Sequence, residues 1–229
     1  NSFTFFTKDT RFNVNKLLQK KNIIKYFDEF VKEYINEDSK ILDYGCGPGT
    51  FSIKLSKMTK NEVHGIDISE GFIEQCNLLK KELSISNFYP HHAKNQNLPY
   101  DNNTFDIILL FDVIHHLENI DQNFSEIKRV LKKDGKIIVY EPNKLNPLIW
   151  LLHLVDPIER GLLKLGTKKK YYEILHKYQL IPIKFNYSGI IVGPNSKILS
   201  FISTILNKKF INKYLGWLNP KLVFIAEKK

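Results

Sequence analysis

The sequence predicts an α/β fold, namely a doubly wound, mostly parallel seven-stranded sheet with an antiparallel last strand and a helical cap. Two observations carry this prediction. From residue 40 to residue 140, short apolar runs of strand length alternate with longer segments of helical spacing. In addition, the glycine-rich turn Asp43-Tyr44-Gly45-Cys46-Gly47-Pro48-Gly49 joins the first strand to a helix. Doubly wound sheets bind ligands at such turns, at the carboxyl ends of their strands.

The elements follow in order along the chain. Apolar residues recur at roughly helical spacing over residues 16–34, and we expect an N-terminal helical lid within residues 1–37. The following strands are expected at 40–44, 62–66, 88–91, 105–111 and 136–140, and the helices between them at 50–58, 71–83 and 121–131, with a turn at 132–135. The strand at 105–111 is almost entirely apolar, which is typical of a strand covered on both faces.

After Tyr140 the alternation stops. Residues 145–165 are strongly apolar, but Asn146, Pro147 and His153 interrupt them, so the stretch is too broken to span a bilayer. Helices are expected at 169–178 and 196–206, and two late strands at 181–185 and 222–226. We therefore expect one domain over 1–229, with a ligand-binding core at 38–141 and basic, apolar cap elements at 142–180 and 188–219.

The charge is unevenly distributed. Residues 1–140 hold 19 Lys and Arg against 19 Asp and Glu, whereas residues 141–229 hold 15 against 5, so the last part carries the whole net charge of +10. This excess indicates an anionic partner or a solvated lysine-rich surface. The two cysteines form neither a disulfide framework nor a metal-ligand pattern, and no secretion signal is visible, which predicts a cytoplasmic location.

The glycine turn is the expected ligand site. Gly45, Gly47 and Gly49 let the backbone turn tightly with no Cβ in the way, so that a ligand can lie directly against peptide groups. Asp43 ends the preceding strand. A carboxylate there repels phosphate and suits a cationic or hydroxyl-bearing ligand.

Asp67 supplies the second part of the site. It ends the second strand, 18 residues beyond Gly49, where a carboxylate can accept hydrogen bonds from both hydroxyls of an adenosyl ribose. Alternatively, Asp67 or Ser69 caps the helix that follows.

With these residues the sequence resembles the class I S-adenosylmethionine-dependent methyltransferases, over roughly residues 38–141. The motifs that carry the resemblance are Ile41–Gly49, Gly65-Ile66-Asp67-Ile68-Ser69, Leu98-Pro99-Tyr100 ahead of Phe105-Asp106, and Val130–Lys136. The resemblance implies a Rossmann-like enzyme whose methyl donor is S-adenosylmethionine and whose product is S-adenosylhomocysteine. A dinucleotide dehydrogenase is disfavoured, because the Gly-x-Gly-x-x-Gly spacing is absent.

The resemblance also assigns residues to the donor: Asp43, Gly45 and Gly47 at its methionine end, Asp67 at the ribose and Ile68 against the adenine. The remaining residues expected in this site are Cys46, Gly49, Asn95 and Phe111. The family often has an acidic residue four positions before the Leu-Pro pair, where this sequence has Lys94. The side-chain carbonyl of the adjacent Asn95 is the expected substitute.

A base for methyl transfer is expected after the strand at 105–111, in the sequence Asp112-Val113-Ile114-His115-His116-Leu117. Histidine takes up a proton near neutral pH, so His115 is the expected base and His116 its more structural neighbour. Alternatively, His115 begins a helix and bonds to backbone. Glu141 opens onto the same crevice and could orient His115, act as the base itself or pair with a cap lysine. No third ligand at metal spacing accompanies the histidines, so no metal site is expected.

The N-terminal helices and the cap are expected to select the acceptor. Apolar residues beside lysines suit an amphipathic acceptor or an anionic membrane surface, unless they form the core of the cap itself. The leading hypothesis is transfer to a hydroxyl of a small apolar, lipid-linked, quinone-like or glycan-type molecule. The basic C-terminal region also permits an RNA methyltransferase, although no Asn/Asp-Pro-Pro-aromatic motif is present. A non-catalytic S-adenosylmethionine-binding partner protein is the third hypothesis, and His115 and Glu141 disfavour it.

Overall fold

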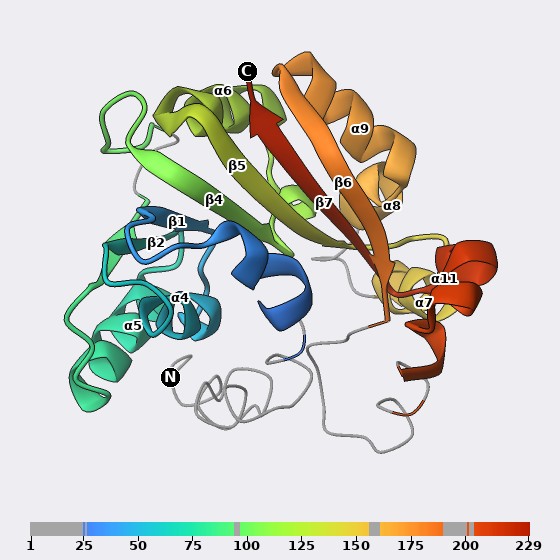
Figure 1. Ribbon diagram of the computed structural model, residues 1–229, viewed down its shortest axis with the longest axis horizontal. Coiled ribbons are helices and arrows are strands. Elements are labelled where there is room, and N and C mark those ends of the chain that lie inside the picture. Colours follow the sequence, from blue (N-terminus) through green and yellow to red (C-terminus); the bar gives the residue numbers. More distant parts are fainter. Residues whose placement is uncertain (1–24, 26, 94–96, 156–160, 190–200, 202–203) are drawn as a thin grey trace.

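A seven-stranded sheet in the order β3-β2-β1-β4-β5-β7-β6 forms the centre of the computed structural model (Figure 1). The structure describes residues 25, 27–93, 97–155, 161–189, 201 and 204–229. The strands are β1 (Ile41–Tyr44), β2 (Val63–Asp67), β3 (Phe88–His92), β4 (Phe105–Phe111), β5 (Leu131–Pro142), β6 (Leu180–Ser188) and β7 (Lys221–Lys228). β7 is antiparallel to both of its neighbours, and the other pairs are parallel. The predicted fold class is confirmed, including the antiparallel last strand.

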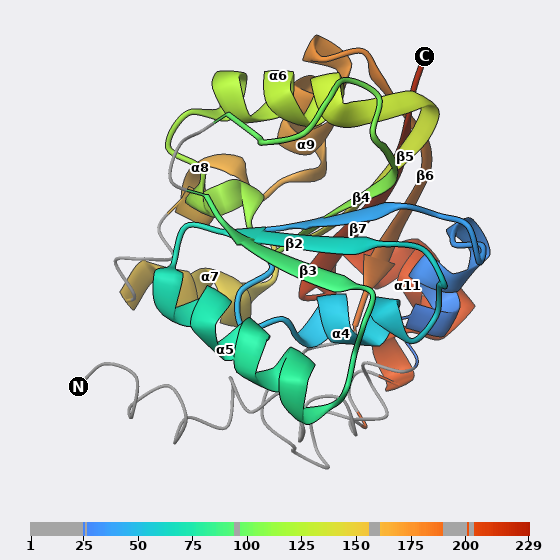
Figure 2. The same cartoon turned by 90° about the vertical axis from the view of Figure 1, so that its left-hand side faces the viewer.

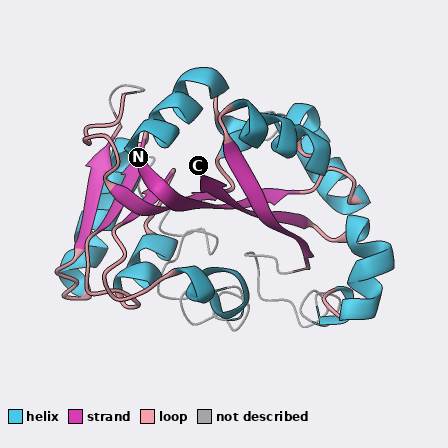
Figure 3. Cartoon of the chain, turned by 45° about the horizontal axis from the view of Figure 1, so that its top comes forward, coloured by secondary structure: helices cyan, strands magenta, loops and turns pink. Residues whose placement is uncertain are grey.

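Helices cover both faces of the sheet (Figures 2 and 3). The helices on one face are α4 (Thr50–Ser56) and α5 (Glu70–Glu82), and those on the other are α6 (Ile120–Val130), α8 (Gly161–Leu165) and α9 (Lys168–Lys177). Alternate residues of β4 pack into different cores: Ile107 and Leu109 with the α4 and α5 side, Ile108 and Leu110 with the α6 and α9 side. The strand is continuously apolar because both of its faces are buried.

Most element boundaries lie within one or two residues of those predicted. β6 ends three residues later than predicted, and β5 differs most. A turn was expected at 132–135, whereas the strand runs from Leu131 to Pro142. Its register against β4 jumps from the pair Phe105–Leu131 to the pair Ile107–Lys136, and Asp134 has a φ of 59°. The expected turn is therefore an insertion that bulges from a continuing strand.

The segments around the sheet differ more from the prediction. Of the predicted helix at 16–34, the described part contains a π-helix at Phe27–Val31 and a 3-10 helix at Lys32–Tyr34, and most of the rest lies outside the described residues. The predicted helix at 196–206 also lies mostly outside them. The apolar stretch after Tyr140 forms α7 (Pro147–Val155) and α8. Helix α11 (Lys209–Leu215) and the 3-10 turn η5 (Gly216–Leu218) were not predicted.

Two histidines face each other on the edge strand β3 and its neighbour β2. His64 Nδ1 lies 3.3 Å from His91 Nε2, and the two rings stack with centroids 5.5 Å apart. Burial lowers the pKa of both, although Glu62 partly opposes this at His64. The unfolded chain therefore takes up protons before the folded protein does, and stability present above about pH 6.5 is lost below it.

We accordingly expect acidification from pH 7.5 to pH 5.5 to lower the melting temperature, with this pair supplying part of the loss. The measurement is thermal unfolding across this pH range for the wild type and for a His64→Gln, His91→Gln double variant. An equally steep pH dependence in the double variant would show that other groups are responsible.

Candidate active site

The turn between β1 and α4 depends on left-handed backbone at alternate positions. Gly45, Gly47 and Gly49 have φ angles of 74°, 51° and 84°, a region that glycine enters without steric cost. The amides of Gly45 and Cys46 donate to the Ile66 carbonyl at 2.8 and 3.0 Å, which fixes the turn against the end of β2. The backbone is therefore held in place before any ligand arrives.

The three glycines have different surroundings. A Cβ on Gly45 would lie 2.3 Å from Val113 Cγ2, and one on Gly49 would lie 2.8 Å from Cys76 Sγ. A Cβ on Gly47 would meet nothing within 4 Å. Gly45 and Gly49 are thus required by packing within the protein, whereas Gly47 borders open space in which a ligand can approach the peptide groups.

Asp67 connects the turn to the loop before α5. Its Oδ2 accepts from the Gly47 amide at 2.9 Å, and its Oδ1 accepts from the Ser69 amide at 2.8 Å. Ser69 is the residue that caps α5, since its hydroxyl accepts from the Phe72 amide. The neighbouring Ile68 is 82% exposed, which is unusual for a large aliphatic side chain and leaves its surface available for contact.

Asp43 and Cys46 lie beneath the turn. Asp43 is buried, and the Ser52 hydroxyl donates to its Oδ2 at 2.6 Å. Burial raises the pKa of Asp43 to about 7, and the nearby Asp67 carboxylate adds to this effect. A hydrogen bond with Cys76 and burial raise the pKa of the Cys46 thiol, which disfavours the reactive thiolate form.

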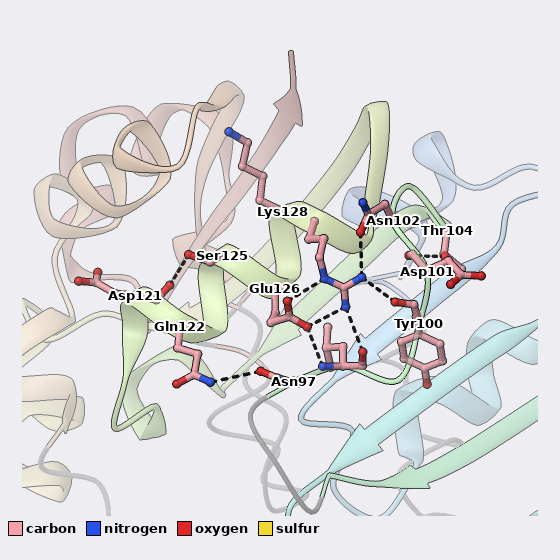
Figure 4. Close-up of polar contacts among 12 residues, drawn as sticks. Asn97, Tyr100, Asp101, Asn102, Thr104, Asp121, Gln122, Ser125, Glu126 and Lys128 are labelled. Carbon is pink, nitrogen blue, oxygen red and sulfur yellow. Dashed lines mark hydrogen bonds and ion pairs between the residues drawn. The ribbon is translucent and has the colours of Figure 1, made fainter.

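The Leu98-Pro99-Tyr100 motif is anchored to α6 (Figure 4). Glu126 Oε2 accepts from the Leu98 amide at 2.8 Å and from Arg129 Nη2 at 2.7 Å. Arg129 also donates to the carbonyls of Leu98 and Tyr100, at 3.0 and 2.7 Å. This network fixes the loop that leads from β3 to β4. Lys94 and Asn95, just before it, lie outside the described residues.

His115 and Glu141 form a buried pair at the ends of β4 and β5. His115 Nδ1 lies 2.6 Å from Glu141 Oε2, and the two side chains are 1% and 0% exposed. Glu141 Oε1 accepts from the amides of Val113 and Ile114, each at 2.8 Å. Burial opposes ionisation of Glu141, but His115 and these two amides outweigh it and lower its pKa. A charged Glu141 requires the proton on Nδ1, so the basic lone pair of His115 is at Nε2.

The helical cap covers this pair. A Cβ on Gly161, the first residue of α8, would lie 1.7 Å from the His115 carbonyl oxygen, so the backbones are in close contact there. Tyr171 on α9 donates its hydroxyl to Glu141 Oε2 at 3.2 Å. His116 is exposed, although its ring lies against that of His115 with centroids 4.0 Å apart. Of the two histidines, the expected base is therefore the covered one.

Several residues of the site were not predicted from the sequence. Ser52, Tyr171, Glu126 and Arg129 contact predicted site residues or motifs, but only Ser52, nine residues after Asp43, is close enough in sequence for a pattern to suggest it. Phe111 was predicted in the site and packs edge-to-face on Phe51 of α4, with ring centroids 4.7 Å apart. Among the described residues, no three His, Cys, Asp or Glu side chains gather as a metal site would require.

The residues of the turn fit an adenosyl sulfonium donor. Open space borders Gly47, and the Asp67 carboxylate accepts from its amide. Asp43 lies buried beneath the turn, close enough to Asp67 for the two carboxylates to interact, and Ile68 offers an apolar surface. Moreover, the buried hydroxyl of Thr50, the first residue of α4, has no hydrogen-bond partner in the described part of the chain. An unsatisfied polar atom at a ligand-binding turn is expected where a ligand supplies the partner.

Comparison with known proteins gives the same answer. Residues 35–179 match the family model described as a methyltransferase domain. An uncharacterized methyltransferase of Schizosaccharomyces pombe is 30% identical over 129 residues, which are 53% of this chain but only 46% of that protein. The ubiquinone/menaquinone biosynthesis C-methyltransferase UbiE of Rickettsia massiliae is 27% identical over 168 residues, 68% of this chain and 67% of that protein.

Solved structures share the fold at lower identity. An S-adenosylmethionine-dependent methyltransferase from Aquifex aeolicus has a TM-score of 0.64 and 17% identity, covering 97% of this chain and 100% of its own. Geranyl diphosphate C-methyltransferase from Streptomyces coelicolor, solved with Mg²⁺, geranyl diphosphate and S-adenosylhomocysteine, has a TM-score of 0.63 and 15% identity, covering 94% and 83%. The family match spans more than half of the chain, and the chain therefore belongs to the methyltransferase-domain family as a class I S-adenosylmethionine-dependent methyltransferase.

Proposed function

We propose that this enzyme methylates a small amphipathic acceptor that carries a hydroxyl on an apolar, lipid-linked, quinone-like or glycan-type molecule. The observation that carries the proposal is the buried His115–Glu141 pair beneath an apolar cap. The cap elements at 142–180 and 188–219, with the N-terminal segment 1–37, are assigned to acceptor selection. Two similar proteins, the ubiquinone/menaquinone biosynthesis C-methyltransferase UbiE and geranyl diphosphate C-methyltransferase, support an apolar acceptor of this class.

Donor binding is assigned to the glycine turn. S-adenosylmethionine supplies a methyl group that is already activated on a sulfonium. Asp43, Gly45 and Gly47 would hold its methionine end, Asp67 its ribose and Ile68 its adenine. Because Asp67 also accepts from the Gly47 amide, the glycine turn and the carboxylate assigned to the ribose are positioned together. The protein then has to align the acceptor and remove its proton.

Proton removal is assigned to His115. Glu141 Oε2 accepts the Nδ1 proton of His115, which leaves Nε2 as the basic atom. Glu141 Oε1 accepts from the amides of Val113 and Ile114, which fixes the carboxylate that orients the ring. The cap keeps water from the imidazole and favours an acceptor that is itself apolar. Loss of the hydroxyl proton makes the oxygen nucleophilic or, in a conjugated acceptor, the carbon ortho to the carbon that bears it, which loses its own proton after methylation. Identification of the product therefore shows which atom receives the methyl group.

The test is an unbiased transfer experiment. The enzyme is incubated with donor labelled in the methyl group and with cell extract separated into lipid, water-soluble small-molecule, RNA and protein fractions. We expect the label in the lipid or small-molecule fraction. Label confined to RNA would instead support the alternative of an RNA methyltransferase, and label in protein would refute both.

A His115→Gln variant tests the base. We expect turnover to fall about 100-fold or more, because general-base catalysis typically contributes 10²–10⁴-fold, while donor affinity stays unchanged. His116→Gln is the matched control, with an effect of less than about threefold. Full turnover in His115→Gln with intact donor binding would remove histidine as the base.

Donor binding is also expected to depend on pH through Asp43. The raised pKa of about 7 means that this carboxyl is partly protonated at neutral pH, whereas a cation bound beside it favours the ionised form. Affinity for S-adenosylmethionine should therefore rise from pH 6 to pH 8, with proton release on binding. Calorimetry in two buffers of different ionisation enthalpy measures that release, and an Asp43→Asn variant should abolish it. A release that persists in this variant would assign it to another group.

A further inference from the structure

Exposed apolar side chains gather on α7, α11 and η5. Large apolar residues normally avoid such exposure in a group, and a cluster of them marks a contact surface. Those on and just before α7 are Leu145, Leu148, Trp150, Leu151 and Leu154, and those on α11 and η5 are Phe210, Tyr214, Leu215 and Trp217, each 43–75% exposed. We call these nine residues the apolar face.

Lysines flank the apolar face, and carboxylates are absent from this part of the sequence. The chain has no Asp or Glu from residue 174 to residue 226, nor from residue 142 to residue 155. Lys208, Lys209 and Lys213 are exposed on and beside α11. Within the described part of the chain, the salt bridges involve none of these three lysines. Glu29, which pairs with Lys25, lines the same pocket as Lys209 and Lys213. The three lysines outnumber it, so the net charge beside α11 is positive and complements an anionic surface.

Two asparagines fix the apolar face to the edge of the sheet that carries the active site. Asn143, directly after β5, donates from Nδ2 to the carbonyls of Trp217 and Asn219, both at 2.8 Å. Asn146 donates to the carbonyl of Leu218, which ties the start of α7 to η5. Since Pro142 pairs with Lys221 in the sheet, α7 leaves and η5 enters at the same edge (Figure 1). Glu141 is two residues from Asn143, so the apolar face adjoins the end of β5, where Glu141 contacts His115.

We propose that the apolar face docks on an anionic phospholipid bilayer. Its tryptophans, tyrosine and leucines would enter the interfacial region, and Lys208, Lys209 and Lys213 would contact the headgroups. A second copy of this chain would bring the same net positive charge to the contact, which disfavours self-association. No helix in the described part of the chain is long and apolar enough to cross a membrane, so the contact is peripheral. The inference rests on the proposed function in one respect: a lipid-linked acceptor would pass from this bilayer into the adjoining site.

Vesicle co-sedimentation of the full chain tests the docking without donor or acceptor. The probes are vesicles of phosphatidylcholine alone and of phosphatidylcholine with about one third phosphatidylglycerol. We expect at least tenfold stronger binding to the anionic vesicles, weakened by 0.5 M salt. Two double variants should each reduce binding to the anionic vesicles about tenfold or more. One is Trp150→Ala with Trp217→Ala, and the other is Lys209→Glu with Lys213→Glu.

The matched control is Leu78→Ala, Lys81→Glu on α5, which removes an exposed leucine and an exposed lysine from another part of the surface and should bind like the wild type. Calorimetric binding of S-adenosylmethionine verifies that every variant is folded. Three results would each overturn the proposal. They are no binding of the wild type to anionic vesicles, equal binding of the wild type and the apolar-face variants, and a wild-type dimer in solution that becomes monomeric in these variants. Methyl transfer to detergent-dissolved lipid extract is measured separately, so loss of docking and failure of the proposed function remain distinguishable.

Discussion

Replacing Gly47 with asparagine is expected to weaken S-adenosylmethionine binding about 100-fold or more while leaving the protein folded. Asparagine tolerates the left-handed backbone that Gly47 adopts at a φ of 51°, so the cost to stability should be about 1 kcal/mol or less. The added side chain projects into the space beside the turn, where nothing in the protein lies within 4 Å of a Cβ. A 100-fold loss corresponds to about 2.7 kcal/mol of binding free energy. Calorimetric titration with the donor measures this loss.

Gly45→Ala is the matched contrast. Its Cβ would collide with Val113 Cγ2 at 2.3 Å, so this smaller substitution should destabilise the fold by several kcal/mol, seen as a lower melting temperature without ligand. We thus expect Gly47→Asn to be folded but unable to bind the donor, and Gly45→Ala to be unstable. Wild-type donor affinity in Gly47→Asn would show that the ligand does not lie against this turn.

Replacing Glu141 with alanine is expected to destabilise the protein by about 3–5 kcal/mol and to abolish measurable turnover. The carboxylate is fully buried and receives hydrogen bonds from two backbone amides, His115 and Tyr171. Removing it leaves all these donors without their shared acceptor in the interior, where each lost partner is costly. Denaturant unfolding monitored by circular dichroism measures the loss.

Glu141→Gln separates support from catalysis. Glutamine retains a carbonyl oxygen for the amides of Val113 and Ile114, so we expect less than half of the destabilisation. Its amide nitrogen would face His115 Nδ1 and favour the wrong tautomer, which should still reduce turnover by about 100-fold or more. If Glu141→Gln were fully active, orientation of His115 by a carboxylate would be unnecessary. If Glu141→Ala were as stable as wild type, the hydrogen bonds around Glu141 would not be important for the fold.

Much of the fold could be predicted because its signals are local. The strand at 105–111 was predicted with its observed boundaries, since a strand buried on both faces is apolar at nearly every position. The bulge at 132–135 and helix α11 were not predicted correctly. The sequence of the bulge has the composition of a turn, and only pairing with β4 keeps it within a strand. In α11, exposed apolar residues and lysines alternate without the single buried face that defines an amphipathic helix.

For the site, the sequence identified the residue types but not their surroundings. Asp67 and Ser69 were alternative helix caps, and the structure shows Ser69 in that role with Asp67 on the glycine turn. Three possibilities were open for Glu141, and the observed contact is with His115. The roles in donor binding and proton transfer remain predictions, which the variants described above test. Asn95 and most of the N-terminal segment lie outside the described residues.

The sequence by itself determined the strand-to-helix turn and the doubly wound sheet, because each depends on short-range requirements: glycine where φ is positive, a period of two or 3.6, and a carboxylate at a strand end. The methyl donor followed from the resemblance of these motifs to the class I methyltransferases. Only the tertiary structure decided which glycine borders open space, which histidine is covered and where the cap attaches. Those properties come from residues far apart in the chain, such as Gly45 beside Val113, His115 on Glu141, and Asn143 on Trp217, 74 residues later. Burial then made an ordinary aspartate, Asp43, one that titrates near neutral pH, an effect of desolvation that no sequence pattern encodes.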